Sequence, residues 1–309
     1  MSPERPVESI AGALLLATSR LRDGELASPR LDAEVLLGHL LGKSRTRLAI
    51  DASDPIASET LAMFDLLVNR RLSGEPVAYL TGGREFMGHT FQVGAGVLVP
   101  RPETELLVER AVAMIERSWP DRPLRVLDLC TGSGVIALSI ARALDRQTAC
   151  EAAAGQRGHE RRVRIIGSDI SADALHYARL NRETLGLLDQ VELVQGDLLT
   201  WTAGPWDLIL TNPPYLRPDQ IDGNMEISAE PRIALDGGEN GVELIERILE
   251  QAAVVAAPRF GMIIELDPDN AHAVRAMAVA RFPAANVIIV PDLTGRDRFV
   301  SIEREESAL

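Results

Sequence analysis

Residues 124–134 read Leu-Arg-Val-Leu-Asp-Leu-Cys-Thr-Gly-Ser-Gly, and they are the clearest indication of the architecture of the chain. Its first six residues are mostly apolar, as in a strand that is buried on both faces of a parallel sheet. A turn with Gly132 and Gly134 follows, and residues 135–144 are apolar enough for a helix that packs on the sheet. Glycines at such a turn let a ligand approach the backbone and the helix N–H groups. The stretch therefore predicts a strand, a ligand-binding turn and a helix.

The carboxylate of Asp128 indicates the charge of the ligand that this turn would bind. Gly132 and Gly134 followed by Ala137 fit the G-x-G-x-x-A pattern of dinucleotide-binding turns, which alone is a weak signal. A carboxylate two residues before the turn would repel a phosphate, whereas it would favour an amino or sulfonium group. We therefore expect a cationic ligand at this turn.

The chain after residue 124 alternates between strand-like and helix-like segments. This alternation is typical of an α/β protein with a mostly parallel sheet. The last two expected strands are joined by a short turn that contains Gly295, which predicts a hairpin near the end of the chain. The strands are expected at residues 124–129, 163–169, 191–197, 206–210, 261–266, 286–290 and 298–302.

Two further strands are expected to end in carboxylates, at Asp169 and at Asp197. The carboxyl ends of parallel strands meet at one edge of a sheet, where ligands of open α/β folds bind. An acid in the position of Asp169 can reach ribose hydroxyls, and Ser171 is available to cap the next helix in its place. Together with Asp128, these side chains predict one extended ligand along that edge.

A second stretch, residues 208–215, reads Leu-Ile-Leu-Thr-Asn-Pro-Pro-Tyr and carries a strand into a rigid turn. Proline has a fixed φ and no backbone N–H, and it holds the preceding residue in an extended conformation. Asn212 is therefore expected at the strand end with little freedom to move. Its amide, the prolyl carbonyls and the ring of Tyr215 suit a planar –NH₂ group. The alternative is a structural Pro-Pro turn with a buried tyrosine.

Residues 1–76 are expected to form a small helical domain. One helix has Ser28 as its cap and Pro29 in its first turn, and it ends at Gly42. Another carries apolar residues on one face and stops at Gly74. The domain is either a plain helical bundle or a partner-recognition domain, and the two interpretations are compatible.

Glycines and prolines interrupt residues 77–104, which predicts a β-hairpin that links the helical domain to a large domain at residues 105–309. Glu103 and Glu105 then open a helix, where carboxylates are favourable to the helix dipole. Arg101 and Glu103 form either an ordinary helix start or a wall of the ligand site, and their spacing does not decide between the two.

Three segments are expected to be irregular. Residues 148–162 lack an apolar period, which predicts a flexible surface insertion. Residues 216–241 are polar and rich in proline and glycine, and a loop of this length in a compact domain is usually functional, for example as a lid. The polar tail at residues 303–309 is expected to fray.

Composition excludes several classes of protein. The chain has 309 residues, 46% of them hydrophobic, and a net charge of −13, which disfavours broad nucleic-acid binding. An acidic surface fits a small molecule or a basic protein partner, or it serves solubility alone. Cys130 and Cys150 show no metal-ligand spacing, so we expect no metal site and reduced thiols, as in the cytoplasm. From the acidic residues scattered through residues 1–30 and the lack of a long apolar run, we expect neither a signal peptide nor a membrane-spanning segment.

These features together resemble the S-adenosylmethionine-dependent methyltransferases of class I. Asn-Pro-Pro-Tyr at residues 212–215 is similar to the motif of enzymes that methylate amide or exocyclic amine nitrogens. Further motifs narrow the likeness to the HemK/PrmC family over nearly the whole chain. They are Leu-Val-Pro-Arg-Pro-Glu-Thr-Glu at residues 98–105, Gly-Gly-Arg-Glu-Phe at residues 82–86, and Glu230-Pro231 with Ala234-Leu235.

The resemblance implies an α/β fold, namely a Rossmann-like class I methyltransferase sheet with an antiparallel C-terminal strand and a substrate-recognising helical domain. Enzymes of this family transfer a methyl group from S-adenosyl-L-methionine to the glutamine of the Gly-Gly-Gln motif in class 1 peptide chain release factors, and S-adenosyl-L-homocysteine remains. The implied partners are these release factors, with no direct binding to DNA or to a membrane. The implied state is a cytoplasmic monomer.

The resemblance also assigns roles to residues. Asn212 and the Pro213 carbonyl would accept hydrogen bonds from the substrate –NH₂ group, and Tyr215 would pack on it, so these three are the expected catalytic residues. The expected substrate site adds Pro214. The cofactor would be held by Cys130, Thr131, Gly132, Ser133, Gly134, Asp169, Asp197, Leu198 and Asn212, with Cys130 to Gly134 around its methionine part, Asp169 on the ribose and Asp197 with Leu198 beside the adenine.

Three positions depart from the family pattern. Cys130 replaces a commoner glycine, which is tolerable if its φ is negative. Leu198 stands where an aromatic residue is often found, which weakens stacking on adenine. Asp267-Pro268 interrupts the glycine that usually follows the strand ending at Glu265.

The expected chemistry needs no strong general base, because the methyl group of a sulfonium is already activated. An amide nitrogen is a poor nucleophile, so its orientation matters. Orientation can contribute several kcal/mol, up to ~7–11 kcal/mol in ideal intramolecular cases. Acceptors fixed where positive charge develops add electrostatic stabilisation.

Other functions remain open at this point. The nearest is methylation of a glutamine in a large-subunit ribosomal protein, because its motifs are nearly the same. A DNA adenine amino-methyltransferase would use a similar clamp on a flipped base, but the acidic charge and the absence of a separate basic domain disfavour it. A non-catalytic cofactor-binding scaffold would leave the clamp idle, and a nicotinamide-linked oxidoreductase would need a catalytic His, Lys or Tyr set.

Overall fold

The computed structural model describes residues 9–119, 123–153 and 163–305. The chain forms two compact units. The first comprises Met1–Gly83 together with Gly223–Ala229, and the second comprises Arg84–Asp222 with Glu230–Leu309. A short segment from the middle of the chain therefore belongs to the N-terminal unit, although the sequence places it in the large domain.

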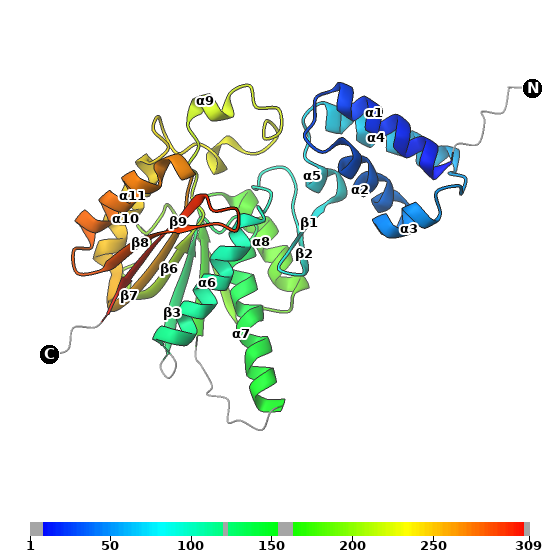
Figure 1. Cartoon of the computed structure of the whole chain (residues 1–309). Coiled ribbons are helices and arrows are strands. Elements are labelled where there is room, and N and C mark those ends of the chain that lie inside the picture. The colour runs from blue at the N-terminus through cyan, green and yellow to red at the C-terminus, as the bar shows by residue number, and fades with distance from the viewer. Residues whose placement is uncertain (1–8, 120–122, 154–162, 306–309) are drawn as a thin grey trace, which may run out of the picture. The chain divides into compact units, whose positions relative to one another are not determined.

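Within the described residues, the N-terminal unit is helical (Figure 1). Its helices are α1 (Ile10–Asp23), α2 (Pro29–Leu41), α3 (Arg45–Ile50), α4 (Ser58–Leu72) and α5 (Val77–Thr81). Leu14, Leu36 and Phe64 pack in its core. Gly42 ends α2 in the left-handed conformation, as predicted, but the Ser28 side chain makes no capping hydrogen bond. The ψ of Ser28 is 56°, which differs from the extended conformation that places a capping hydroxyl over the first turn of a helix.

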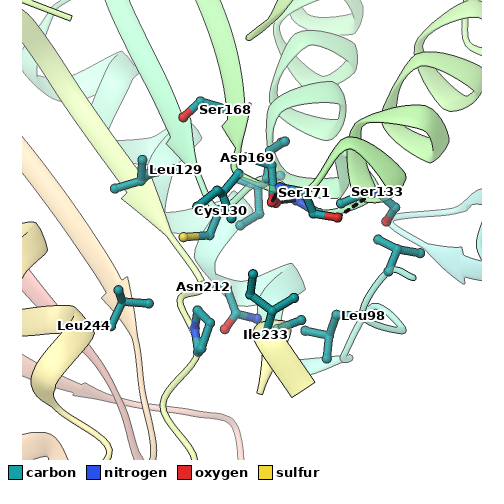
Figure 2. A pocket seen from close by; sticks show the side chains of 18 of the residues that line it. Leu98, Leu129, Cys130, Ser133, Ser168, Asp169, Ser171, Asn212, Ile233 and Leu244 are labelled. Atoms are coloured by element: carbon teal, nitrogen blue, oxygen red, sulfur yellow. Dashed lines mark hydrogen bonds between the residues drawn. The ribbon is translucent and has the colours of Figure 1, made fainter. Parts of the chain in front are cut away.

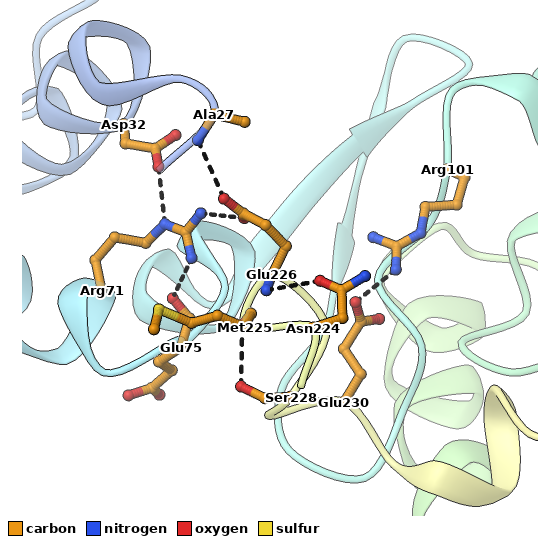
Figure 3. Close-up of polar contacts among 10 residues, drawn as sticks. All are labelled: Ala27, Asp32, Arg71, Glu75, Arg101, Asn224, Met225, Glu226, Ser228 and Glu230. Carbon is orange, nitrogen blue, oxygen red and sulfur yellow. Dashed lines mark hydrogen bonds and ion pairs between the residues drawn. The ribbon is translucent and has the colours of Figure 1, made fainter. Parts of the chain in front are cut away.

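A buried arginine explains why residues 223–229 belong to this unit (Figure 3). Arg71 donates a hydrogen bond from Nε to Asp32 Oδ2 at 2.8 Å, and its Nη2 pairs with Glu226. The other carboxylate oxygen of Glu226 accepts a hydrogen bond from the backbone N–H of Ala27 at 3.2 Å. Because Arg71 and Asp32 are both buried, their charges depend on these partners.

The second unit is built on a seven-stranded sheet in the order β5-β4-β3-β6-β7-β9-β8. The first five of these strands run parallel, whereas β9 is antiparallel to both β7 and β8. This arrangement confirms the predicted mostly parallel sheet with an antiparallel C-terminal strand. The strands are β3 (Leu124–Leu129), β4 (Val163–Asp169), β5 (Val191–Gln195), β6 (Trp206–Thr211), β7 (Ala256–Glu265), β8 (Asn286–Pro291) and β9 (Asp297–Arg304).

Helices cover both faces of this sheet (Figure 1). The helices α6 (Glu103–Ser118), α7 (Val135–Ala153) and α8 (Ala172–Thr184) lie on one side, and α10 (Glu243–Val255) and α11 (Ala271–Arg281) lie on the other. Successive side chains of a strand point to opposite faces of the sheet. Leu208 and Leu210 therefore pack in the core on the side of α6 and α7, and Ile209 packs in the core on the side of α10 and α11. Two-sided burial explains the continuous apolar runs of β3 and β6.

The hairpin expected in residues 77–104 is shorter than predicted. It consists of β1 (Gly83–Phe86) and β2 (His89–Gln92), and it follows the helical turn α5. Asn181 of α8 connects the hairpin to the turn after β3, because its Oδ1 accepts from Gln92 N at 2.6 Å and its Nδ2 donates to Ser133 O at 2.9 Å. The hairpin therefore packs as part of the sheet-containing unit.

The predicted insertion at residues 148–162 is corrected in part. Helix α7 continues to Ala153, so residues 148–153 are helical, and residues 154–162 lie outside the described residues. Alanine is the best helix former, which outweighs the missing apolar period there. The tail is likewise shorter than expected, since β9 includes Glu303 and Arg304, whereas residues 306–309 lie outside the described residues.

The long segment at residues 216–241 contains short regular pieces. It forms α9 (Pro218–Ile221) and the 3₁₀ helix η1 (Arg232–Ala234), and Leu216 bridges to Asp236. A second 3₁₀ helix, η2 (Pro268–Asn270), precedes α11. In the described part of the chain, the structure shows no helix with both the length and the apolar character needed to cross a membrane.

Candidate active site

A cavity of about 550 Å³ lies at the carboxyl edge of the sheet in the second unit (Figure 2). The turn after β3 and the ends of β4, β5 and β6 form its floor. Residues 96–101 and residues 232–236 supply further lining. The site therefore lies where ligands bind in open α/β sheets.

Most of the sequence-predicted site residues come together here. Those that line the cavity are Cys130, Thr131, Gly132, Ser133, Asp169, Asp197, Leu198, Asn212 and Pro214. Over the described residues, the lining leaves out Gly134, Pro213 and Tyr215. Pro213 is buried, and Tyr215 is half-buried and packs against the core that α10 and α11 cover. Burial and the nearby Glu265 raise the pKa of Tyr215.

Asp128 does not face the cavity, contrary to the expectation that it meets a cationic ligand. It is fully buried under α7, where its Oδ2 accepts from Thr131 Oγ1 at 2.5 Å and from Ala137 N at 3.0 Å. Removal from water raises the pKa of Asp128 to about 7. Side chains of β3 alternate between the two faces of the sheet, and Asp128 lies on the face that α7 covers. From there its hydrogen bonds to Thr131 and Ala137 stabilise the turn after β3.

Asp169 joins β4 to the turn after β3. Its Oδ2 accepts a hydrogen bond from Gly132 N at 2.9 Å, and its Oδ1 accepts from Ser171 N at 2.9 Å. Gly132 has a φ of 57°, a conformation that glycine adopts without strain. Ser171 caps α8 through Oγ, which accepts from Ala174 N at 3.2 Å, as predicted. Burial raises the pKa of Asp169.

The two departures that line the cavity share a backbone feature. Cys130 has a φ of 59° and Leu198 a φ of 47°, so both occupy the left-handed region. The condition under which Cys130 replaces glycine without strain is therefore not met, and such a backbone costs an L-residue about 1–2 kcal/mol. Removal from water, followed by the charge of Asp169, raises the pKa of the Cys130 thiol, while a hydrogen bond with Thr211 opposes this shift.

Asn212 is oriented by two residues that the sequence did not single out as site residues. Its Nδ2 donates to Thr104 Oγ1 at 3.2 Å, and the Thr104 hydroxyl donates to Glu265 Oε2 at 2.8 Å. Thr104 and Glu265 are buried, and burial raises the pKa of Glu265 to about 7. Both lie within or beside family motifs, which was the available signal, but their contact spans 161 residues of sequence.

Of the two alternatives left open for Arg101, an ordinary helix start or a wall of the site, the structure shows the second, because Arg101 lines the cavity. Its guanidinium pairs with Glu230 Oε1 (Figure 3). Glu230 Oε2 accepts a hydrogen bond from Val99 N at 2.9 Å. The Glu230 side chain is 1% exposed, so the pair is anchored in the protein. Glu103 lies in the first turn of α6, as an ordinary acidic residue at a helix start. On the far side, Asp197 pairs with Arg247 at 3.2 Å.

The strand order, the antiparallel β9 and a site at the strand ends define a Rossmann-like methyltransferase of class I. Family models agree with this class. Residues 103–223 match the RMKL-like methyltransferase domain, and residues 12–82 match the PrmC N-terminal domain.

Curated relatives cover nearly the whole chain, and each of the following is a release factor glutamine methyltransferase. That of Moorella thermoacetica is 37% identical over 95% of this chain and 98% of its own. The relative from Deinococcus radiodurans is 35% identical over 94% and 97%, and that from Bradyrhizobium diazoefficiens is 34% identical over 96% and 95%. The chain belongs to the release factor glutamine methyltransferase family.

Proposed function

We propose that this protein transfers a methyl group from S-adenosyl-L-methionine to the side-chain amide nitrogen of the glutamine in the Gly-Gly-Gln motif of class 1 peptide chain release factors. Such methylation modifies the machinery of translation termination. The observation that carries the proposal is the orientation of Asn212, whose Nδ2 is used by Thr104. Its Oδ1 is thereby left to accept a hydrogen bond from an –NH₂ group at the cavity.

The residues of the cavity fit this cofactor. Asp169 presents a carboxylate to ribose hydroxyls, and Cys130 to Gly134 supply the turn for the methionine part. Asp197 and Leu198 form the wall for adenine. A floor with two carboxylates suits a sulfonium cation and disfavours a pyrophosphate. When bound, S-adenosyl-L-methionine supplies an activated methyl group, and S-adenosyl-L-homocysteine is the expected product.

This chain's own residues then position the acceptor nitrogen. Asn212 Oδ1 accepts from the substrate amide and holds its nitrogen in a fixed direction, which lowers the entropic barrier. The Pro213 carbonyl is proposed as a second acceptor, and Pro214 and Tyr215 shape the turn that carries both. Because these acceptors are fixed before the reaction, they stabilise positive charge that develops on the nitrogen. The surplus proton leaves to water, so no side chain must act as a strong base.

A labelling experiment tests the proposal. The protein is incubated with methyl-labelled cofactor and, in parallel, with a class 1 release factor, its Gln→Ala variant, a large-subunit ribosomal protein and DNA. We expect label on the release factor and none on the variant or the DNA. Label on the ribosomal protein alone would assign the neighbouring activity instead. We also propose that the protein is a cytoplasmic monomer. Size-exclusion chromatography of the full chain tests the oligomeric state.

A further inference from the structure

We infer that Thr104 and Glu265 are positioning residues that fix the orientation of the Asn212 amide and so make the site select a carboxamide over a carboxylate. The inference rests on the proposed function and deepens it. It concerns how the site distinguishes glutamine from glutamate, two side chains of nearly equal size that differ in –NH₂ and –O⁻.

Hydrogen bonds link Asn212, Thr104 and Glu265 in the sheet-containing unit. The three side chains form one chain of hydrogen bonds, from Asn212 Nδ2 to Thr104 Oγ1 at 3.2 Å and from Thr104 Oγ1 to Glu265 Oε2 at 2.8 Å. The exposed fractions of Thr104 and Glu265 are 2% and 1%, so water does not compete for these bonds. These hydrogen bonds connect Thr104 at the start of α6, Glu265 at the end of β7 and Asn212 directly after β6, all within the sheet-containing unit.

The direction of these hydrogen bonds determines which atom of the Asn212 amide faces Thr104. An ionised carboxylate only accepts hydrogen bonds, so the single hydroxyl proton of Thr104 is committed to Glu265. Thr104 Oγ1 can then only accept from Asn212, which requires Nδ2 on that side and places Oδ1 on the other. Among the described residues, the structure shows no donor to Asn212 Oδ1, which leaves this atom available to a ligand in the cavity.

This orientation of the Asn212 amide requires that Glu265 is ionised. A neutral Glu265 could donate to Thr104, which would free the hydroxyl proton for Asn212 Oδ1 and turn Nδ2 toward the cavity. The charged and titratable groups around Glu265 are Arg101 and Glu103 at the start of α6, Arg298 of β9 and Tyr215 after β6. Burial raises the pKa of Glu265 to about 7, whereas the hydrogen bond from Thr104 and then the charges of Arg298 and Arg101 oppose this rise. The orientation is therefore expected to weaken as the pH falls through this value.

The test uses three variants of the full chain and one control. Thr104→Val removes the hydroxyl at nearly constant volume, Thr104→Ser retains it, and Glu265→Gln removes the charge while it keeps the shape. Ser139→Ala is the control, because Ser139 is also a buried hydroxyl but lies in α7 away from the cavity lining. The readouts are kcat and KM with a release factor, and calorimetric binding of Gly-Gly-Gln and Gly-Gly-Glu peptides to enzyme loaded with S-adenosyl-L-homocysteine.

We expect Thr104→Val and Glu265→Gln to lower kcat by about 10- to 100-fold, with little change in KM. This is less than the roughly 100- to 1000-fold loss for a preorganised group that itself contacts the substrate, because both residues act through Asn212. The preference for the Gln over the Glu peptide falls in both variants, whereas Thr104→Ser keeps kcat and the peptide preference near the wild-type values. The decline of wild-type kcat below pH 7 is absent in Glu265→Gln. Ser139→Ala behaves as the wild type in every measurement.

Unchanged kcat and unchanged peptide preference in a folded Thr104→Val variant would overturn the inference, as would a kcat decline that persists in Glu265→Gln. If Thr104→Val does not fold, the pH profile and the peptide preference of Glu265→Gln decide alone. Failure of the proposed function looks different, because the wild-type protein itself would then neither label a release factor nor bind the Gln peptide.

Discussion

The Asp169 carboxylate accepts a hydrogen bond from the Gly132 amide at 2.9 Å, and this bond fastens the end of β4 to the turn after β3. The second oxygen of Asp169 holds Ser171 N at the start of α8. One carboxylate therefore shapes the glycine turn and also lines the cavity. Its loss is therefore expected to change both the lining of the cavity and the backbone of the turn.

We expect Asp169→Asn to weaken cofactor binding by about 10- to 100-fold, since a hydrogen bond to a charged group is worth about 1.5–3 kcal/mol. Asp197→Asn is the matched control with a smaller effect, because Asp197 is half exposed and already pairs with Arg247. Calorimetric titration with S-adenosyl-L-homocysteine measures both affinities. Equal losses in the two variants would contradict the special role of Asp169.

Asn212→Ala is expected to lower kcat by about 100- to 1000-fold, as when one preorganised catalytic polar group is removed. Affinity for the cofactor should change much less, because the other lining residues remain. Steady-state kinetics with a release factor, together with calorimetry, separate the two effects. Near-normal turnover in a variant that binds the cofactor would exclude Asn212 as the acceptor.

The sequence predicted those features that depend on local patterns. The apolar runs of β3 and β6 follow from two-sided burial, and the glycine turn and Ser171 cap follow from local backbone chemistry. Asn212 was identified because prolines restrict the residue before them. Such signals lie within a few residues of the feature that they predict.

The features that escaped prediction depend on contacts between distant parts of the chain. Thr104 and Glu265 acquire their roles only through Asn212, and no spacing rule connects the three. Glu226 joins the helical unit through Arg71, 155 residues away. Asp128 was assigned to the ligand because its face of β3 cannot be read without knowing where α7 packs.

Stability should fall as the pH rises from about 4 to 7, and Asp128 is one cause. Burial raises its pKa from 3.8 to about 7, so the folded protein keeps a proton that the unfolded chain has lost. The free energy of unfolding therefore decreases across this interval and levels off above it. Urea unfolding at a series of pH values should show a shallower decrease for Asp128→Asn. An unchanged slope would show that Asp128 is ionised in the folded protein.

Arg71→Met is expected to destabilise the helical unit by about 3–5 kcal/mol, because it leaves the buried Asp32 without its counterion. Hydrogen exchange should accelerate in α2 and α4. The three tryptophans all lie in the sheet-containing unit, so their fluorescence reports that unit separately. The double variant Arg71→Met, Asp32→Leu should recover much of the loss, and a loss equal to that of the single variant would argue against the ion pair as its cause.

The Cys130 thiol is expected to resist alkylation at pH 8. Its pKa is raised because the surrounding protein excludes water and because Asp169 lies nearby, so the reactive thiolate is scarce. Iodoacetamide treatment followed by peptide mass spectrometry should find the peptide of residue 130 unmodified in the native protein and modified after denaturation. Rapid native modification would show that the thiol is ionised in the cavity.

The assignment of residues 223–229 to the helical unit has a consequence for how this unit can be exchanged between proteins. The unit is not one contiguous stretch of the sequence, because its Arg71 pairs with Glu226, which lies far along the same chain. A chimera that replaces only residues 1–83 would pair a foreign helical unit with the native loop and break that match. The two pieces must therefore be transplanted, and are expected to evolve, together.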